Sequence, residues 1–251
     1  MRKLKVIASD SSKGCRDINQ DSILIQEFEN GDVLLAVADG MGGGVMGKEL
    51  SALATNELKN IISKPPTYPL KALKDAIYKI NFKISETLWI YDIKNRTKIE
   101  KQKGGTTLCA VYYRDGKIFY INIGDSRVSI CGYDKLLNLS IDQNLYTKKG
   151  FDNLDREDKD KSKILYILGI SSDIEIEKLL NDSKYRAMGI FDFNKFNSYN
   201  KIILSTDGFH NFIDINNFCK NYNNFDNILK EVKNISDDNI TYIIAKEEVY
   251  V

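Results

Sequence analysis

One uninterrupted apolar run followed by glycines constrains this 251-residue chain more than any other stretch. Val33 to Ala38 contains six apolar residues without a polar break, which is typical of a strand buried on both faces. The run ends at Asp39-Gly40, and the glycines from Gly42 to Gly44 would let the backbone approach a ligand closely. A carboxylate at a strand end beside a glycine loop suits a hard cation with oxygen ligands.

The composition limits the classes of function. The chain is 43% hydrophobic and 28% charged, which is ordinary for a globular protein, and we expect a single domain over residues 1–251. Thirty-six Lys and Arg against 35 Asp and Glu leave a net charge of +1, so no basic excess favours nucleic acid as a partner.

Nothing in the sequence indicates a membrane span or a signal peptide. No stretch approaches the roughly 18 apolar residues of a spanning helix, and the apolar run near the N-terminus is too short for a leader. We therefore expect a cytoplasmic protein without a membrane partner. The four cysteines form no CxxC pair, so the sequence predicts reduced thiols.

Hydrophobic periodicity predicts strands separated by helices. Strands are expected at Lys3–Ala8, Ser22–Phe28, Val33–Ala38, Thr106–Tyr113, Lys117–Ile123, Arg127–Cys131, Leu136–Leu139, Ile202–Leu204 and Ile240–Ala245. Helices are expected at about 45–62, over 70–88, and at Phe225–Val232. Residues 140–163 are polar and without clear period, which predicts a mobile surface segment.

Several acidic residues lie at turns or loop edges beside apolar strands. They are Asp21, Asp39, Asp125, Asp207 and Asp238. Each alone is unremarkable because Asp is a common turn residue. If the strands share one sandwich, however, their ends can converge, and divalent cations would offset the repulsion between the carboxylates. Such a cluster with two cations is a hydrolytic two-metal site.

Arg16 lies five residues before Asp21 in the stretch CRDINQD. It is either a solvated surface side chain or a clamp for a phosphate group, because the planar guanidinium matches phosphate oxygens.

Six short motifs follow one another along the chain. They are R-D-I-N-Q-D at Arg16–Asp21, V-A-D-G-M-G-G at Val37–Gly43, G-G-T-T at Gly104–Thr107, I-G-D-S-R at Ile123–Arg127, S-T-D-G at Ser205–Gly208 and D-N-I-T at Asp238–Thr241. In this order they resemble the metal-dependent Ser/Thr protein phosphatases of type 2C. Met41 and the I-L-Y-I-L-G stretch at Ile164–Gly169 are similar to the bacterial branch of that family.

This resemblance implies an α+β fold, a four-layer α/β/β/α sandwich with two central antiparallel β-sheets flanked by helices. It implies a protein Ser/Thr phosphatase that hydrolyses phosphoserine and phosphothreonine through attack of a metal-bridging hydroxide. Two Mn²⁺ or Mg²⁺ ions would form the core site, with a weaker third ion beside them. Phosphorylated proteins, substrates of a Ser/Thr kinase, would be its partners.

Motif position also implies individual roles. Asp39 would bridge the two metals, the Gly40 carbonyl would bind one of them, and Asp207 and Asp238 would hold the other. Asp21 would orient metal-bound water.

The resemblance gives roles to two further residues. Arg16 would bind the substrate phosphate, so that Arg16, Asp21 and Asp39 form the catalytic set. Asp125 would share the third metal with Asp207.

Some positions depart from the family pattern. Met41 stands where eukaryotic members carry a His proposed as general acid, so water would have to protonate the leaving group. Asn211 stands where many members carry an Asp, which weakens the expected third metal site. The flap segment, around 140–168, matches only loosely and is where substrate choice is expected. His210, the only histidine, has no motif support for a catalytic role.

Three other interpretations remain to be weighed. Gly42–Lys48 fits the P-loop pattern, but Glu49 stands where that motif needs Ser or Thr. A cysteine-based phosphatase needs an Arg six positions after its Cys, and none of the four cysteines has one. A catalytically silent binding or regulatory protein on the same fold should have lost its metal ligands, yet Asp39, Asp207 and Asp238 are all present.

Overall fold

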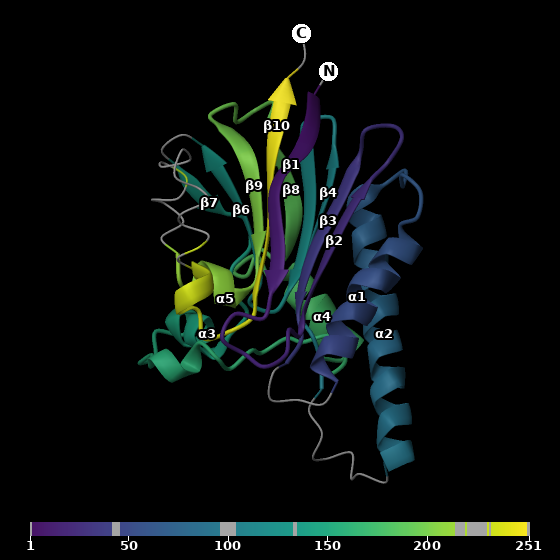
Figure 1. The fold of residues 1–251 in the computed structure, drawn as a ribbon, viewed down its shortest axis with the longest axis vertical. Coiled ribbons are helices and arrows are strands. Elements are labelled where there is room, and N and C mark those ends of the chain that lie inside the picture. The colour runs from purple at the N-terminus through teal and green to yellow at the C-terminus, as the bar shows by residue number, and fades with distance from the viewer. Residues whose placement is uncertain are drawn as a thin grey trace.

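In the computed structural model two antiparallel sheets of five strands each form the centre of the molecule (Figure 1). The structure describes residues 2–41, 46–95, 104–132, 135–213, 219, 230 and 232–249. The strand order is β1-β10-β9-β6-β7 in one sheet and β2-β3-β4-β5-β8 in the other. The strands are β1 (Arg2–Ser12), β2 (Asp21–Glu27), β3 (Val33–Asp39), β4 (Leu108–Arg114), β5 (Lys117–Ile123), β6 (Arg127–Gly132), β7 (Leu136–Asn138), β8 (Met188–Asp192), β9 (Tyr199–Ser205) and β10 (Ile240–Val249).

The apolar run of β3 is explained by two different cores on its two faces. Val33, Leu35 and Val37 pack into the core between the two sheets. Leu34, Ala36 and Ala38 pack into the core between their sheet and the helices. Because successive strand residues point to opposite faces, a strand between two apolar layers must be apolar at every position.

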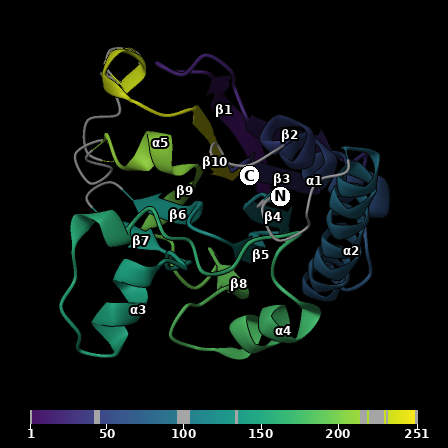
Figure 2. The same cartoon turned by 90° about the horizontal axis from the view of Figure 1, so that it is seen from below.

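Helices cover the outer face of the β2-β3-β4-β5-β8 sheet. The helices α1 (Gly47–Ile61) and α2 (Pro69–Asn95) lie side by side against it (Figures 1 and 2). On α2 the residues Leu73, Ile77, Ile80 and Ile84 recur every three or four positions and are fully buried. The short helix α4 (Asp173–Asn181) joins this layer, because Ile176 and Leu179 pack into the same core and Asn81 of α2 donates a hydrogen bond to Asp173 Oδ1 at 2.9 Å.

The outer face of the other sheet carries a smaller apolar cluster. Phe209 of α5 (Asp207–His210), Cys219 and Val232 pack there against Ile203 of β9 and Ile244 of β10. The helices α3 (Leu145–Phe151), α4 and α5 lie around the lower ends of the strands (Figure 2). Together these layers confirm the expected α/β/β/α sandwich.

All nine predicted strands are present within a few residues of their expected bounds. The helix α4 and strand β8 were not predicted, although Ser172 and Glu175 form a capping box that marks the start of α4 in the sequence. The polar segment 140–163 contains α3 and the short helix η2 (Asp158–Asp160), which its lack of periodicity did not indicate. Most of the helix expected at 225–232 lies outside the described residues.

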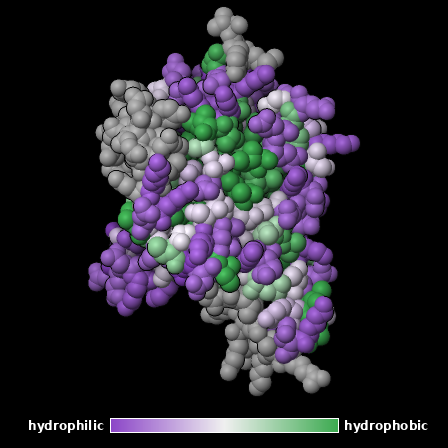
Figure 3. Space-filling model, in the orientation of Figure 1, coloured by the Kyte–Doolittle hydropathy of each residue, from purple (hydrophilic) through white to green (hydrophobic). Residues whose placement is uncertain are grey.

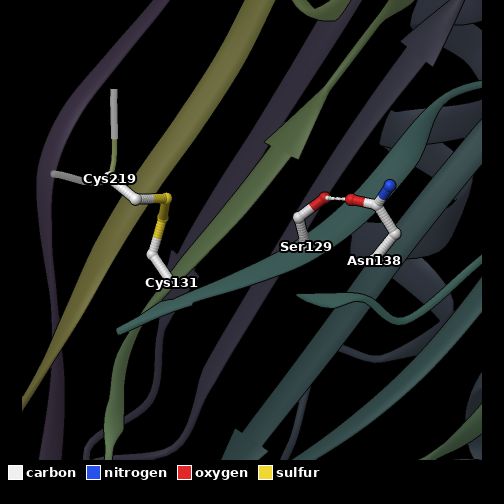
Figure 4. Close-up of a disulfide and its surroundings, with 4 residues drawn as sticks. All are labelled: Ser129, Cys131, Asn138 and Cys219. Atoms are coloured by element: carbon white, nitrogen blue, oxygen red, sulfur yellow. Dashed lines mark hydrogen bonds between the residues drawn. A yellow bond between two sulfur atoms is a disulfide. The ribbon is translucent and has the colours of Figure 1, made fainter. Parts of the chain in front are cut away.

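The cysteine prediction is wrong for two of the four residues. Cys131 at the end of β6 and Cys219 form a disulfide with a Cα–Cα distance of 5.8 Å (Figure 4). The two residues are 88 positions apart, so sequence spacing could not reveal that the fold brings them together. Cys15 and Cys109 are free thiols.

Surface properties are mixed. Hydrophilic side chains dominate the face seen in Figure 3, with one apolar area in its upper half. Within the described residues, no helix has both the length and the apolar character that crossing a bilayer requires.

We expect Ile80→Ala to lower the free energy of unfolding by about 2–5 kcal/mol, because it leaves a cavity beneath α2. Urea unfolding followed by circular dichroism would measure the change. Ile174→Ala on α4 is the matched control, because that side chain is 69% exposed and should change stability by no more than about 0.5 kcal/mol. Equal effects of the two substitutions would contradict this account of the core.

Candidate metal centre

Strand pairing brings the first two candidate carboxylates together. Asp21 opens β2 and Asp39 closes β3, and the two residues are direct partners in the antiparallel register. Directly opposite residues have Cβ atoms about 4.5–5.5 Å apart and share one face of the sheet. Two acids placed in this way repel each other unless a cation lies nearby.

The G-G-T-T motif fixes the main chain of Asp39. The Asp39 amide donates a hydrogen bond to the Thr107 hydroxyl at 2.9 Å, and the Thr107 amide donates one to the Asp39 carbonyl at 2.8 Å. The Thr106 hydroxyl donates to the same carbonyl at 2.9 Å. The hydroxyls of Thr107 and Ser126 are also hydrogen-bonded, at 2.8 Å, which connects this motif to I-G-D-S-R. These hydrogen bonds fix the main chain of Asp39 and leave its carboxylate at the end of β3.

The S-T-D-G motif joins the same edge from the other sheet. The Thr206 hydroxyl donates to Asp21 Oδ2 at 2.9 Å and accepts from the Thr241 amide at 3.1 Å. Asp207 follows as the first residue of α5. A Cβ on Gly208 would lie 2.0 Å from the Asn239 carbonyl oxygen, so only glycine fits where these two loops meet.

Asn239 of the D-N-I-T motif holds the loop that carries Arg16. Its side-chain oxygen accepts from the Gln20 amide at 2.8 Å, and its nitrogen donates to the carbonyls of Lys13 and Ile18 at 3.0 and 2.9 Å. Arg16 then reaches back to Asp238, with 2.9 Å between Nη2 and Oδ2. The sequence predicted neither the role of Asn239 nor this ion pair.

The carboxylates titrate as a crowded acidic group. Burial, and after it repulsion from Asp207 and Asp238, raises the pKa of Asp21 to about 7. Burial and the neighbouring carboxylates also raise the pKa of Asp39 and Asp125 well above the ordinary value. The pKa of Asp207 is raised by burial and then by Asp238. These shifts show that the five predicted acids are electrostatically close.

Several carboxylate oxygens at this edge lack a protein partner. Asp21 Oδ1, Asp125 Oδ1 and Asp207 Oδ1 are buried and accept no hydrogen bond within the described part of the chain. Unpaired buried acceptors are costly, and a hard divalent cation satisfies them best. No three acidic, His or Cys side chains of the described residues are grouped closely enough to hold one ion alone. The residues therefore fit ions that complete their shells with main-chain oxygen or water, as Mg²⁺ commonly does.

A cavity of about 620 Å³ adjoins the carboxylates. Asp125 and Asp207 line it, together with residues of the 140–162 segment. Arg127 fixes one side through two hydrogen bonds of 2.6 Å to Asp142.

Residues 14–248 match the family model of protein phosphatase 2C. The chain belongs to the protein phosphatase 2C family. This match confirms the resemblance to the type 2C phosphatases and the enzyme class that it implies, a phosphoprotein phosphatase.

Named relatives agree with this assignment. A Mycoplasma pneumoniae protein provisionally named a protein phosphatase is 27% identical over 254 residues, covering 94% of this chain and 93% of the relative. The serine/threonine phosphatase Stp1 of Staphylococcus aureus superposes with a TM-score of 0.76 at 20% identity, covering 99% of this chain and 95% of that one. The catalytic domain of PstP, solved with two manganese ions, gives 0.74 at 19% identity, covering 99% and 100%. The structural likeness shows the family fold.

Three residues that do not match the family motifs lie near the carboxylates or the cavity. Met41 donates its amide hydrogen to the Gly105 carbonyl at 3.1 Å, and Asn211 lines the cavity just after α5. His210 is buried with Nδ1 at 3.0 Å from the Ser205 hydroxyl, and burial lowers its pKa well below the ordinary value. His210 also lines the cavity together with Asp207. Residues 42–45, on which the P-loop interpretation depends, lie outside the described residues.

The metal-free protein should become less stable as the pH rises. The pKa of Asp21 is raised from 3.8 to about 7 on folding, so between these values the folded state binds more protons than the unfolded state. The free energy of unfolding then falls with rising pH across this window. With chelator present we expect a lower Tm at pH 8 than at pH 5, and a smaller difference in Asp21→Asn.

Asp17→Asn is the control for this experiment, because Asp17 is an exposed acid in the loop just before Asp21. Thermal melts at both pH values would measure the effect. A pH dependence equal in wild type and Asp21→Asn would contradict the assignment of the linkage to Asp21.

Proposed function

We propose that this phosphatase removes phosphate from phosphoserine and phosphothreonine in proteins with the help of Mn²⁺ or Mg²⁺ bound at the carboxylate edge. The observation that carries the proposal is the convergence of buried carboxylate oxygens without protein partners at the ends of both sheets. The two manganese ions of PstP favour a two-ion core of the same kind here. Residues 1–251 would form one phosphatase domain, with 140–168 as its flap.

The metal ligands of the proposal come from several elements. Asp39 would lie between the two ions, with the Gly40 carbonyl on one and Asp207 and Asp238 on the other. Asp125 would hold a weaker third ion with Asp207. Bound cations supply Lewis-acid polarisation of the phosphate and make water more acidic.

The chain's own residues would position the reactants. Asp21 has Oδ2 occupied by Thr206, which leaves Oδ1 to accept a hydrogen bond from the attacking water. Arg16 would turn from Asp238 to the phosphate oxygens, because the guanidinium is exposed and paired at only one carboxylate oxygen. Met41 offers no acidic proton, so water would protonate the leaving serine or threonine oxygen.

The expected partners are phosphoproteins that a Ser/Thr kinase has phosphorylated. The near-neutral charge of the chain argues against nucleic acid as a ligand. A cytoplasmic location stays a prediction. The alternative, a silent phosphatase fold, would be expected to lose carboxylates, and none of the predicted ones is missing.

Hydrolysis of a phosphothreonine peptide by the purified protein tests the proposal. We expect activity with Mn²⁺ or Mg²⁺, none with excess chelator, and a loss of at least about 100-fold in Asp39→Asn, because that variant removes a charge shared by both ions. Circular dichroism would check that the variant folds. Inactivity of folded wild type under every metal, or full activity of Asp39→Asn, would refute the proposal.

Arg16→Ala should raise KM for the same peptide about tenfold or more, because it removes a charge-assisted bidentate contact to phosphate. The Mn²⁺ concentration for half-maximal activity should change much less. Lys13→Ala removes an exposed positive charge from the same loop and is the control. An unchanged KM in Arg16→Ala would exclude the phosphate clamp.

A further inference from the structure

The cavity beside the carboxylates is suited to the part of a substrate that flanks its phosphorylated residue. Its inner wall includes Asp125 and Asp207, so anything bound in it lies next to the proposed metal centre. Tyr146 of α3 and Lys161 also line the cavity, as does Arg186, which lies between α4 and β8 in the chain. A phosphorylated serine or threonine held at the metals would place neighbouring side chains in this space.

Most charges on the cavity wall are already paired within the protein. Asp142 binds Arg127 through two contacts of 2.6 Å, and Asp158 lies 3.0 Å from Lys161. Lys161 also lies over the Tyr146 ring, at 5.2 Å from its centroid. The carboxylates of the metal centre would be neutralised by its cations.

Arg186 is different. Its side chain is exposed, and no ion pair or hydrogen bond links its guanidinium to another described residue. The backbone φ of Arg186 is 49°, in the left-handed region that is unfavourable for a residue with a Cβ.

The backbone on both sides of Arg186 is fixed by hydrogen bonds. The carbonyl of buried Tyr185 accepts from the Ile141 amide at 3.0 Å, and the carbonyl of buried Ala187 accepts from the Asn122 amide at 2.7 Å. The fold therefore imposes the left-handed conformation on a residue whose guanidinium makes no ion pair or hydrogen bond with another described residue. Strain of this kind persists mainly at functional positions.

We propose that the cavity is a subsite for an acidic side chain of the phosphoprotein, near the phosphorylated residue, and that Arg186 binds its carboxylate. This rests on the proposed function and extends it to the choice of substrate. The guanidinium fork matches a carboxylate in two contacts, and partial enclosure by the cavity strengthens the pair relative to an exposed one. Arg186 is then a specificity residue and takes no part in the chemical step.

Two sets of phosphothreonine peptides test the subsite. One has Ala at the flanking positions, and the other has Glu at each flanking position in turn. In wild type we expect one Glu position to raise kcat/KM about five- to tenfold through KM, the range of a partly desolvated ion pair. In Arg186→Gln the ratio of kcat/KM between the Glu and Ala peptides should fall to about one, whereas Lys184→Gln, an exposed neighbour outside the cavity, should keep it.

The ratio of kcat/KM compares two peptides on the same variant, so a smaller fraction of active enzyme lowers both values equally and leaves the ratio unchanged. A ratio of about one in wild type, or an unchanged ratio in Arg186→Gln, would overturn the subsite. Hydrolysis of p-nitrophenyl phosphate by wild type with Mn²⁺ tests the proposed function separately. If that reaction fails as well, the metal centre itself has been misassigned.

Two more variants separate recognition from structure. Arg186→Gly relieves the left-handed strain, so we expect a higher Tm together with loss of the Glu preference. Arg186→Lys keeps the charge and should retain part of the preference. A higher Tm in Arg186→Gly with the Glu preference intact would show that the strain has no role in recognition and would overturn the proposal.

Discussion

Repulsion between carboxylates is the constraint on which the rest of this structure depends. Asp21 and Asp39 are forced into opposition by the β2–β3 register, and Asp207 and Asp238 reach the same edge from the other sheet. The apolar cores on both faces of β3 supply the stability that holds these acids in place. Cations that bind these crowded acids would stabilise the folded chain, because they bind the folded state in preference to the unfolded one.

Neutral hydrogen bonds determine the geometry of the edge. The hydroxyls of Thr106, Thr107 and Thr206 and the amide group of Asn239 bind main chain or one carboxylate oxygen and add no charge. They leave Asp21 Oδ1, Asp125 Oδ1 and Asp207 Oδ1 buried without a hydrogen-bond partner among the described residues. This division explains why Thr and Asn accompany the acids in the motifs: charged partners would compete with the cations for the same oxygens.

The sequence predicts features that depend on neighbouring residues, and it misses features that depend on contacts between distant segments. The buried strand Val33–Ala38 and the carboxylates at strand ends are local patterns, and the structure pairs two of those acids, Asp21 and Asp39, across neighbouring strands. The Cys131–Cys219 disulfide joins segments whose meeting depends on the whole fold, so no local signal exists. Arg186 was missed for a related reason, because its neighbours are held by hydrogen bonds to residues far away in the sequence, Ile141 and Asn122.

If Asp238 binds a metal ion and Arg16 binds phosphate as proposed, the ion pair between them would connect the two events. Without cations at the edge, the Arg16 guanidinium provides positive charge beside the acids, at 2.9 Å from Asp238. An ion on Asp238 weakens that attraction, since the carboxylate is then neutralised and the cation repels the guanidinium. An Arg16 released in this way would present its planar guanidinium to the phosphate oxygens. Under the proposed function, an ion on Asp238 would therefore free Arg16 for the phosphate, because one carboxylate cannot fully neutralise both the ion and the guanidinium.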